Sequence, residues 1–126
     1  MEGNYAEAEP TRTGSCRITG EVDGLVVTNN TFVGFEHASS LGPLYVAGGQ
    51  GVQLLGNTMT RSRYGVWLNA GGGGLVIRGN TISDVRGGDA LIYLAGGDGV
   101  RVETNYLSGG QGKSGIKLLR GVGHWV

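Results

Sequence analysis

Several features that often guide a functional assignment are scarce in this chain of 126 residues. A single cysteine, Cys16, excludes an internal disulfide framework. Ten basic and ten acidic side chains give a formal net charge of zero, so the basic surface that nucleic acids and anionic membranes require is missing. Apolar runs extend over only a few residues, too short for a membrane-spanning helix. The length then predicts one domain with a modest core.

Proline is also rare, whereas glycine is abundant: two prolines stand against 27 glycines. The glycines follow no three-residue period, which excludes a collagen triple helix. Aliphatic residues recur between the glycines, which argues against low-complexity disorder. Glycine placed between short apolar runs instead indicates many turns that need positive φ or a close approach of two backbones.

One short pattern recurs along the chain: a glycine, alternating aliphatics, an asparagine and a further aliphatic. It reads GLVVTNNTF at residues 24–32, GVQLLGNTM at 51–59, GLVIRGNTI at 74–82 and GVRVETNYL at 99–107. Its asparagines, spaced by 27, 23 and 25 residues, are Asn30, Asn57, Asn80 and Asn105. A period of this length predicts a solenoid of stacked repeats.

The apolar residues inside each repeat have the periodicity of strands. Leu75 and Ile77, like Val52 and Leu54, alternate with a period of two. The runs are short and bounded by glycine, which argues against helical solenoids. Leucine-rich repeats are similar in length but need a leucine framework that this chain lacks.

With these motifs in place, residues 14–121 resemble the right-handed parallel β-helix of the pectate-lyase-like superfamily, which includes tailspike-like and polysaccharide-active proteins. The matching positions of two copies are Gly74, Leu75, Ile77, Asn80 and Ile82, and Gly51, Val52, Leu54, Asn57 and Met59. The resemblance implies an all-β, single-stranded parallel β-helix of about four to five coils stacked about 4.8 Å apart. We expect this domain over residues 14–126, whole or as a segment of a longer helix, after a flexible tail at residues 1–13.

Stacked coils would place like positions of successive repeats above one another. Three interior columns are then expected: Leu25, Val52, Leu75 and Val100; Val27, Leu54, Ile77 and Val102; Phe32, Met59, Ile82 and Leu107. The repeated asparagines would lie at a bend between sheets, where their amides can hydrogen-bond neighbouring backbone. Stacked, they predict an amide ladder.

A second recurring pattern predicts an outward-facing row. It reads LYVAGGQG at 44–51, VWLNAGGGG at 66–74 and IYLAGGDG at 92–99. If its aliphatics face inward, the residues that face outward are Tyr45, Trp67, Tyr93 and, one coil further, Lys117, with Arg17 before them. Sugar rings stack on such aromatic faces, so we interpret this row as a binding site for a glycan. A protein interface and simple cover of the sheet are the alternatives.

The loops after each asparagine hold much of the charge. Stacking is expected to bring Arg61 and Arg63 near Asp84 and Asp89. A lyase or epimerase needs a cation beside a uronate and a base, and a hydrolase needs two carboxyl groups around one bond. These four residues are therefore the candidate catalytic set, with solvated loop charges as the alternative. An ion pair between Arg78 and Glu103 on adjacent coils is also predicted.

The remaining motifs give little support for a nucleotide, metal or cofactor site. GQGKSG at 110–115 lacks the upstream glycine of a Walker A loop, and the strand-like IKLLRG that follows argues against a dinucleotide fingerprint. His37 and His124 lie far apart in sequence and Cys16 has no partner, so no metal site and no cofactor are expected. Calcium bound by loop aspartates is the alternative that the family resemblance leaves open.

Three functions follow as hypotheses. The first is a glycan-recognising segment of a cell-surface or virion protein of the tailspike-like kind, located outside the cell. The second is a polysaccharide lyase, epimerase or hydrolase. The third is a structural or oligomerising module. The expected partners are a polysaccharide or surface glycan, and either further copies of the chain or the rest of a longer chain, without nucleic acid or membrane.

Overall fold

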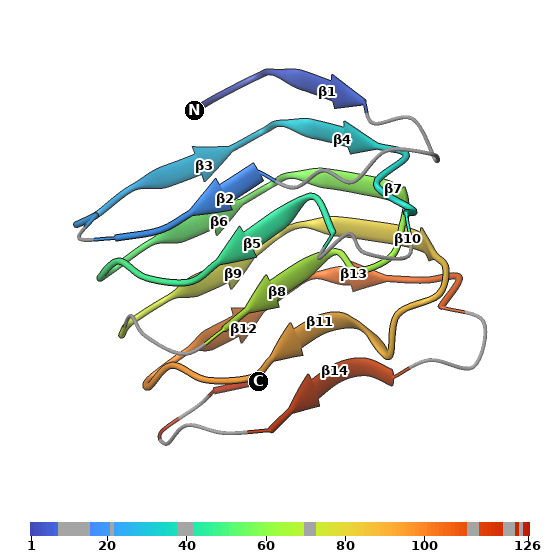
Figure 1. The fold of residues 1–126 in the computed structure, drawn as a ribbon. Helices are drawn as coiled ribbons and strands as arrows, with labels where there is room; N and C mark the ends of the chain where they lie inside the picture. Colours follow the sequence, from blue (N-terminus) through green and yellow to red (C-terminus); the bar gives the residue numbers. More distant parts are fainter. Residues whose placement is uncertain are drawn as a thin grey trace.

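A computed structural model describes residues 1–7, 16–20, 22–37, 42–69, 73–110, 114–119, 123 and 125–126. Within these residues the chain forms fourteen short strands and no helix. The chain winds from strand to strand in stacked coils, and every paired strand runs parallel to its neighbour (Figure 1). The predicted all-β parallel β-helix is confirmed.

Each coil passes through three sheets in turn. The first sheet has the order β12-β9-β6-β3, with bounds Arg101–Glu103, Val76–Arg78, Gln53–Leu55 and Val26–Thr28. The second has the order β1-β4-β7-β10-β13, with bounds Tyr5–Glu7, Thr31–Val33, Thr58–Ser62, Thr81–Val85 and Tyr106–Leu107. The third has the order β14-β11-β8-β5-β2, with bounds Ser114–Leu118, Ala90–Leu94, Val66–Leu68, Leu44–Val46 and Cys16–Ile18.

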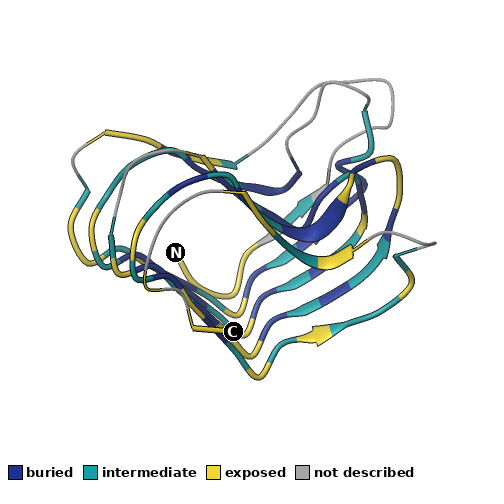
Figure 2. Cartoon of the chain, turned by 90° about the horizontal axis from the view of Figure 1, so that it is seen from below, coloured by how far each residue is buried: buried dark blue, intermediate teal, exposed yellow. Residues whose placement is uncertain are grey.

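The inward residues of successive coils are in register, as the repeat predicts. Val27 aligns with Leu54 and Ile77 in the first sheet, and Phe32 aligns with Met59 and Ile82 in the second. All the predicted interior residues are buried except Leu25 and Leu107. These two are partly buried and lie in the outer coils. Viewed along the stack, the coils overlie one another around this shared core (Figure 2).

Each coil turns at corners where one residue has positive φ. The glycine that opens the repeat takes this role before the first sheet, with φ between 60° and 68°: Gly24, Gly51, Gly74, Gly99 and Gly123. An L side chain rarely adopts this conformation without strain, so glycine recurs here for a stereochemical reason. The recurring glycine therefore marks the entry to the first sheet.

The recurring asparagine forms the predicted amide ladder between the first and second sheets. Asn30 Nδ2 donates to Asn57 Oδ1 at 3.1 Å, Asn57 Nδ2 to Asn80 Oδ1 at 3.1 Å, and Asn80 Nδ2 to Asn105 Oδ1 at 2.9 Å. A backbone N–H of each donor residue also reaches the same oxygen. The three inner amides are buried and satisfied by this ladder and by backbone carbonyls.

The first seven residues differ from the expected flexible tail. β1 pairs with β4, and Glu2 forms a bridge with Thr28. Asn4 adds one more step to the ladder, because its Nδ2 donates to Asn30 Oδ1 at 3.1 Å. The sequence argument missed this step because Asn4 lacks the aliphatic pattern of the later copies. Residues 8–13 of the expected tail lie outside the described residues.

At the other end of the stack, apolar residues are exposed. Leu118 aligns with the buried Leu94 but is 48 % exposed, and Trp125, which bridges to Arg101, is 71 % exposed.

Among the described residues there is no helix with the length and apolar character that crossing a membrane requires.

Candidate functional site: an aromatic row on the third sheet

The outward residues of the third sheet form one row across consecutive coils. Tyr45 aligns with Trp67, Trp67 with Tyr93, and Tyr93 with Lys117. Arg17 on β2 aligns with Tyr45 at the other end. In β5 and β8 the row residue is half-buried between two buried neighbours, as expected for an outward position. The predicted alignment is therefore confirmed, and we call these five residues the aromatic row.

The rings of the aromatic row pack against one another and against a ring that the sequence argument missed. Trp67 and Tyr93 have centroids 4.6 Å apart at an angle of 45°. Tyr64 lies edge-on to both, with centroids 4.6 Å from Trp67 and 5.7 Å from Tyr93. Tyr64 is only 4 % exposed, so it is a buried support for the two rings that it contacts. Its place in a loop, outside the repeated pattern, gave no sequence signal.

Two glycines make room for Tyr64. A Cβ added at Gly88 would lie 2.9 Å from the Tyr64 ring carbons and would collide with the Arg63 carbonyl oxygen. A Cβ added at Gly42 would lie 2.9 Å from the Tyr64 Cβ and would collide with the Tyr64 carbonyl oxygen. Approach this close is possible only without a side chain. The loops before β5 and β11 thus hold the supporting ring in place.

Polar groups border the aromatic rings of the row. Arg17 places its guanidinium carbon 5.5 Å from the Tyr45 ring centroid, and Lys117 places Nζ 5.6 Å from that of Tyr93, both within the range of cation–π contact. Asn69 Nδ2 donates to the Tyr45 hydroxyl at 2.9 Å. Lys117 also binds Asp89 Oδ2 at 3.2 Å. The row thus offers ring faces with hydrogen-bonding and charged groups at its borders.

The Trp67 indole N–H is buried and has no hydrogen-bond acceptor among the described residues. A buried donor without an acceptor costs about 1–3 kcal/mol. Because no hydrogen bond orients Trp67, its ring contacts with Tyr64 and Tyr93 fix the indole plane. The orientation of the central ring therefore depends on Tyr64.

Asp84, Asp89 and Arg63 of the candidate catalytic set each contact a different residue. Asp84 accepts two hydrogen bonds from Arg86, at 2.9 and 2.8 Å, and this contact raises the pKa of Arg86. Asp89 binds Lys117, and the Arg63 guanidinium lies 5.6 Å from the Tyr64 ring centroid. Each carboxylate therefore already faces a cation of this chain.

Arg61 and Asp84 share one structural role. Both have positive φ, 50° and 52°, at a bend one residue before the end of β7 and of β10 in the second sheet. Gly34 occupies the position equivalent to Arg61 one coil earlier, with φ 83°. The unusual backbone of these two residues is therefore explained by the turn of the coil.

The predicted ion pair between Arg78 and Glu103 is wrong. The two residues are aligned on adjacent strands, but Glu103 binds Arg101 instead, with Arg101 Nη2 2.7 Å from Glu103 Oε1. Arg101 lies two residues away on the same face of β12, so Glu103 reaches it without crossing to the next coil.

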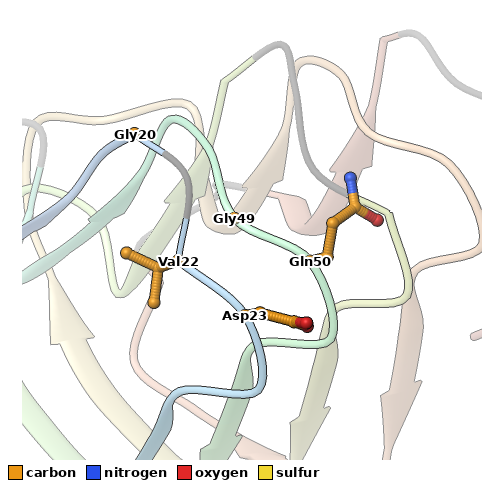
Figure 3. Close-up of a pocket in the computed structure, with 5 residues that line it drawn as sticks. All are labelled: Gly20, Val22, Asp23, Gly49 and Gln50. Atoms are coloured by element: carbon orange, nitrogen blue, oxygen red, sulfur yellow. The ribbon is translucent and has the colours of Figure 1, made fainter.

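A shallow pocket lies apart from the aromatic row, at the turns that follow β2 and β5. It is lined by Gly20, Val22, Asp23, Gly49 and Gln50 (Figure 3). Gln50 Oε1 accepts a hydrogen bond from the Gly73 N–H at 3.2 Å, which ties neighbouring coils together. Among the described residues of its lining, Asp23 is the one charged group.

The described residues contain no cluster of three or more His, Cys, Asp or Glu side chains suited to a metal ion. Burial raises the pKa of the Cys16 thiol, which disfavours the reactive thiolate. His124 and residues 111–113 of the GQGKSG segment lie outside the described residues. The segment leads into β14, so a strand follows it, as predicted.

Comparison with protein families adds one finding to this geometry. The model of a family described as the right-handed β-helix region matches residues 11–124. The chain belongs to the right-handed β-helix family. Comparison with curated proteins and with solved structures gave no match. Membership of this β-helix family establishes the fold, while the function has to be argued from the site itself.

Proposed function

We propose that this β-helix chain binds a glycan on the aromatic row of its third sheet, as a segment of a cell-surface or virion protein. The observation that carries the proposal is the set of three aligned aromatic residues on adjacent coils, Tyr45, Trp67 and Tyr93. Sugar rings present flat C–H faces that pack on aromatic rings, while their hydroxyls need polar partners beside the rings.

The residues around the aromatic row suit glycan binding. Tyr64 and its two glycine contacts hold the Trp67 and Tyr93 rings in fixed positions, and preorganised rings lose little freedom when a ligand binds. Asn69 and Arg17 supply polar groups beside Tyr45. Adjacent coils are about 4.8 Å apart, so the row suits an extended chain of sugars.

Binding is a better proposal than catalysis for the residues described. Asp84 is hydrogen-bonded to Arg86 and Asp89 to Lys117. Glycoside hydrolysis requires two carboxyl groups around one bond, whereas these two carboxylates contact different cations. The described contacts of Asp84 and Asp89 therefore favour binding over hydrolysis.

The test is a glycan array followed by affinity electrophoresis with the glycans retained. Trp67→Ala and Tyr93→Ala should each weaken binding about tenfold or more, because each removes a stacking face. Tyr106→Ala is the matched control: Tyr106 is an outward aromatic on the second sheet and is 65 % exposed. It should leave binding unchanged.

Circular dichroism of every variant checks that the coils remain folded. Absence of any retained glycan would remove the proposed function. Unchanged binding in both row variants would place the glycan elsewhere on the molecule.

A further inference from the structure

We infer that the glycan bound by the aromatic row is acidic, with carboxylate or sulfate groups along the sugar chain. This inference rests on the proposed function and adds the chemical class of the ligand. Three cations border the aromatic rings: Arg17 at Tyr45, Arg63 at Tyr64 and Lys117 at Tyr93. In the described part of the chain, the one anion that pairs with these three cations is Asp89.

Arg17 is the strongest element of the inference. It is exposed and aligned with Tyr45 at the β2 end of the row. Within the described part of the chain, Arg17 forms no ion pair, and the Tyr45 ring is its contact. Because no ion pair occupies its N–H groups in the described part of the chain, this guanidinium can bind a carboxylate or sulfate in a bidentate manner.

Lys117 marks the opposite end and shows how an acid group would be held. Its Nζ lies near the Tyr93 ring and 3.2 Å from Asp89 Oδ2. The Asp89 side chain is 61 % exposed, so an ion pair of this kind contributes little and can be exchanged. Asp89 thus occupies the position that an acid group of a ligand would take.

The spacing suits a polymer rather than a single sugar. Arg17 and Lys117 are separated by four steps between coils, which corresponds to about 19 Å. Arg63 lies between them, beside the supporting ring. A chain that stacks on the three rings would pass all three cations.

A nucleic acid is also a polyanion with stackable rings, but the whole chain has zero net charge. Nucleic-acid binding depends on an extensive basic surface. The basic groups beside the rings are few, and others lie elsewhere, such as Arg78 and Arg101 on the first sheet. This sparse distribution favours a sparsely charged acidic glycan. A single-stranded DNA arm in the experiment tests this choice directly.

The experiment compares glycans that differ only in charge. Alginate and polygalacturonate are each run beside their carboxyl-reduced neutral forms in affinity electrophoresis, with single-stranded DNA and polyglutamate as other polyanions. The acidic form should bind at least about fivefold more tightly than its neutral form, and raised salt should shrink this difference. Polyglutamate, which lacks sugar rings, should bind weakly.

Two charge variants act in opposite directions. Arg17→Gln should weaken binding of the acidic form about three- to tenfold, because it removes a charge-assisted contact, and should leave the neutral form almost unchanged. Asp89→Asn should tighten binding of the acidic form about two- to fivefold, because Lys117 loses its internal partner. A structural role for Asp89 would predict no such gain.

Arg78→Gln is the matched control, since Arg78 is an exposed arginine on the first sheet and lies outside the row. Equal loss in the Arg17 and Arg78 variants would overturn the inference in favour of general charge attraction. Equal binding of acidic and neutral forms would also overturn it, yet leave the proposed function standing. Preferred binding of DNA would overturn both the proposed function and the acidic-glycan inference. Glycan retention that does not depend on Trp67 would also overturn both.

Discussion

A ladder of asparagines, one per coil and buried at Asn30, Asn57 and Asn80, is the residue-scale feature that makes this fold specific. Asn57 is fully buried, donates to Asn80 Oδ1 and to the Val27 carbonyl, and accepts two hydrogen bonds from Asn30. A buried amide is tolerated only when its groups are satisfied. Because the partner of each asparagine is the next asparagine, the ladder fixes the vertical alignment of the coils.

Replacing Asn57 with alanine should therefore be strongly destabilising. The substitution removes the acceptor of the Asn30 backbone N–H, one acceptor of the Asn30 side-chain amide and a donor to the Val27 carbonyl, all in the interior. We expect the free energy of unfolding to fall by about 2–4 kcal/mol. Urea denaturation followed by circular dichroism measures the change.

Asn4→Ala is the matched control, because Asn4 is exposed at the end of the same ladder and water can replace its bonds. It should cost less than about 1 kcal/mol. Similar losses in the two variants would mean that burial of the ladder contributes nothing to its strength.

At the scale of strands, the sequence predicted alignment well and contacts between side chains less well. A repeat of 23 to 27 residues brings equivalent residues onto adjacent parallel strands, so the row from Tyr45 to Lys117 followed from counting. The position of Tyr64 could not be predicted by counting, because Tyr64 lies in a loop whose path is set by close backbone contacts. The Arg78–Glu103 prediction failed because alignment alone does not decide which neighbour a flexible side chain contacts.

The loop before β11 should be needed for the aromatic row. In Gly88→Ala, the new methyl group meets the Tyr64 ring and the Arg63 carbonyl, so the loop and the ring must separate. We expect a loss of about 1–3 kcal/mol in stability and weaker glycan retention, since Tyr64 no longer supports Trp67. Near-ultraviolet circular dichroism of the aromatic rings should change as well.

Gly115→Ala serves as the control for the same chemical change in a strand of the third sheet. A Cβ added at Gly115 makes an ordinary contact of 3.6 Å with Leu107 Cδ1. Its stability and its aromatic spectrum should remain close to those of the parent. If Gly88→Ala behaved like Gly115→Ala, the loop would not position Tyr64.

On the scale of the whole molecule, the described strands of each coil pair only with strands of the coils beside it. Strands pair with the equivalent strands one coil before and one coil after, and the core is a continuous column through the stack. Stability of such a solenoid is a sum over coils and their interfaces, so it falls where a coil has one neighbour instead of two. Leu118 and Leu119 are exposed, whereas Leu94 on the preceding coil is fully buried. We therefore expect the coil of β12–β14 to be less stable than the coil before it.

Amide hydrogen exchange can measure this gradient because the fold supplies equivalent hydrogen bonds. In the third sheet, the N–H that follows each strand donates to the preceding coil at 2.8–2.9 Å: Ala47 to Ile18, Asn69 to Val46, Ala95 to Leu68 and Leu119 to Leu94. Their geometry is nearly identical, so differences in protection report the opening of coils. We expect the Leu119 amide to exchange at least about tenfold faster than those of Asn69 and Ala95. Uniform protection would instead require the whole stack to open as one cooperative unit.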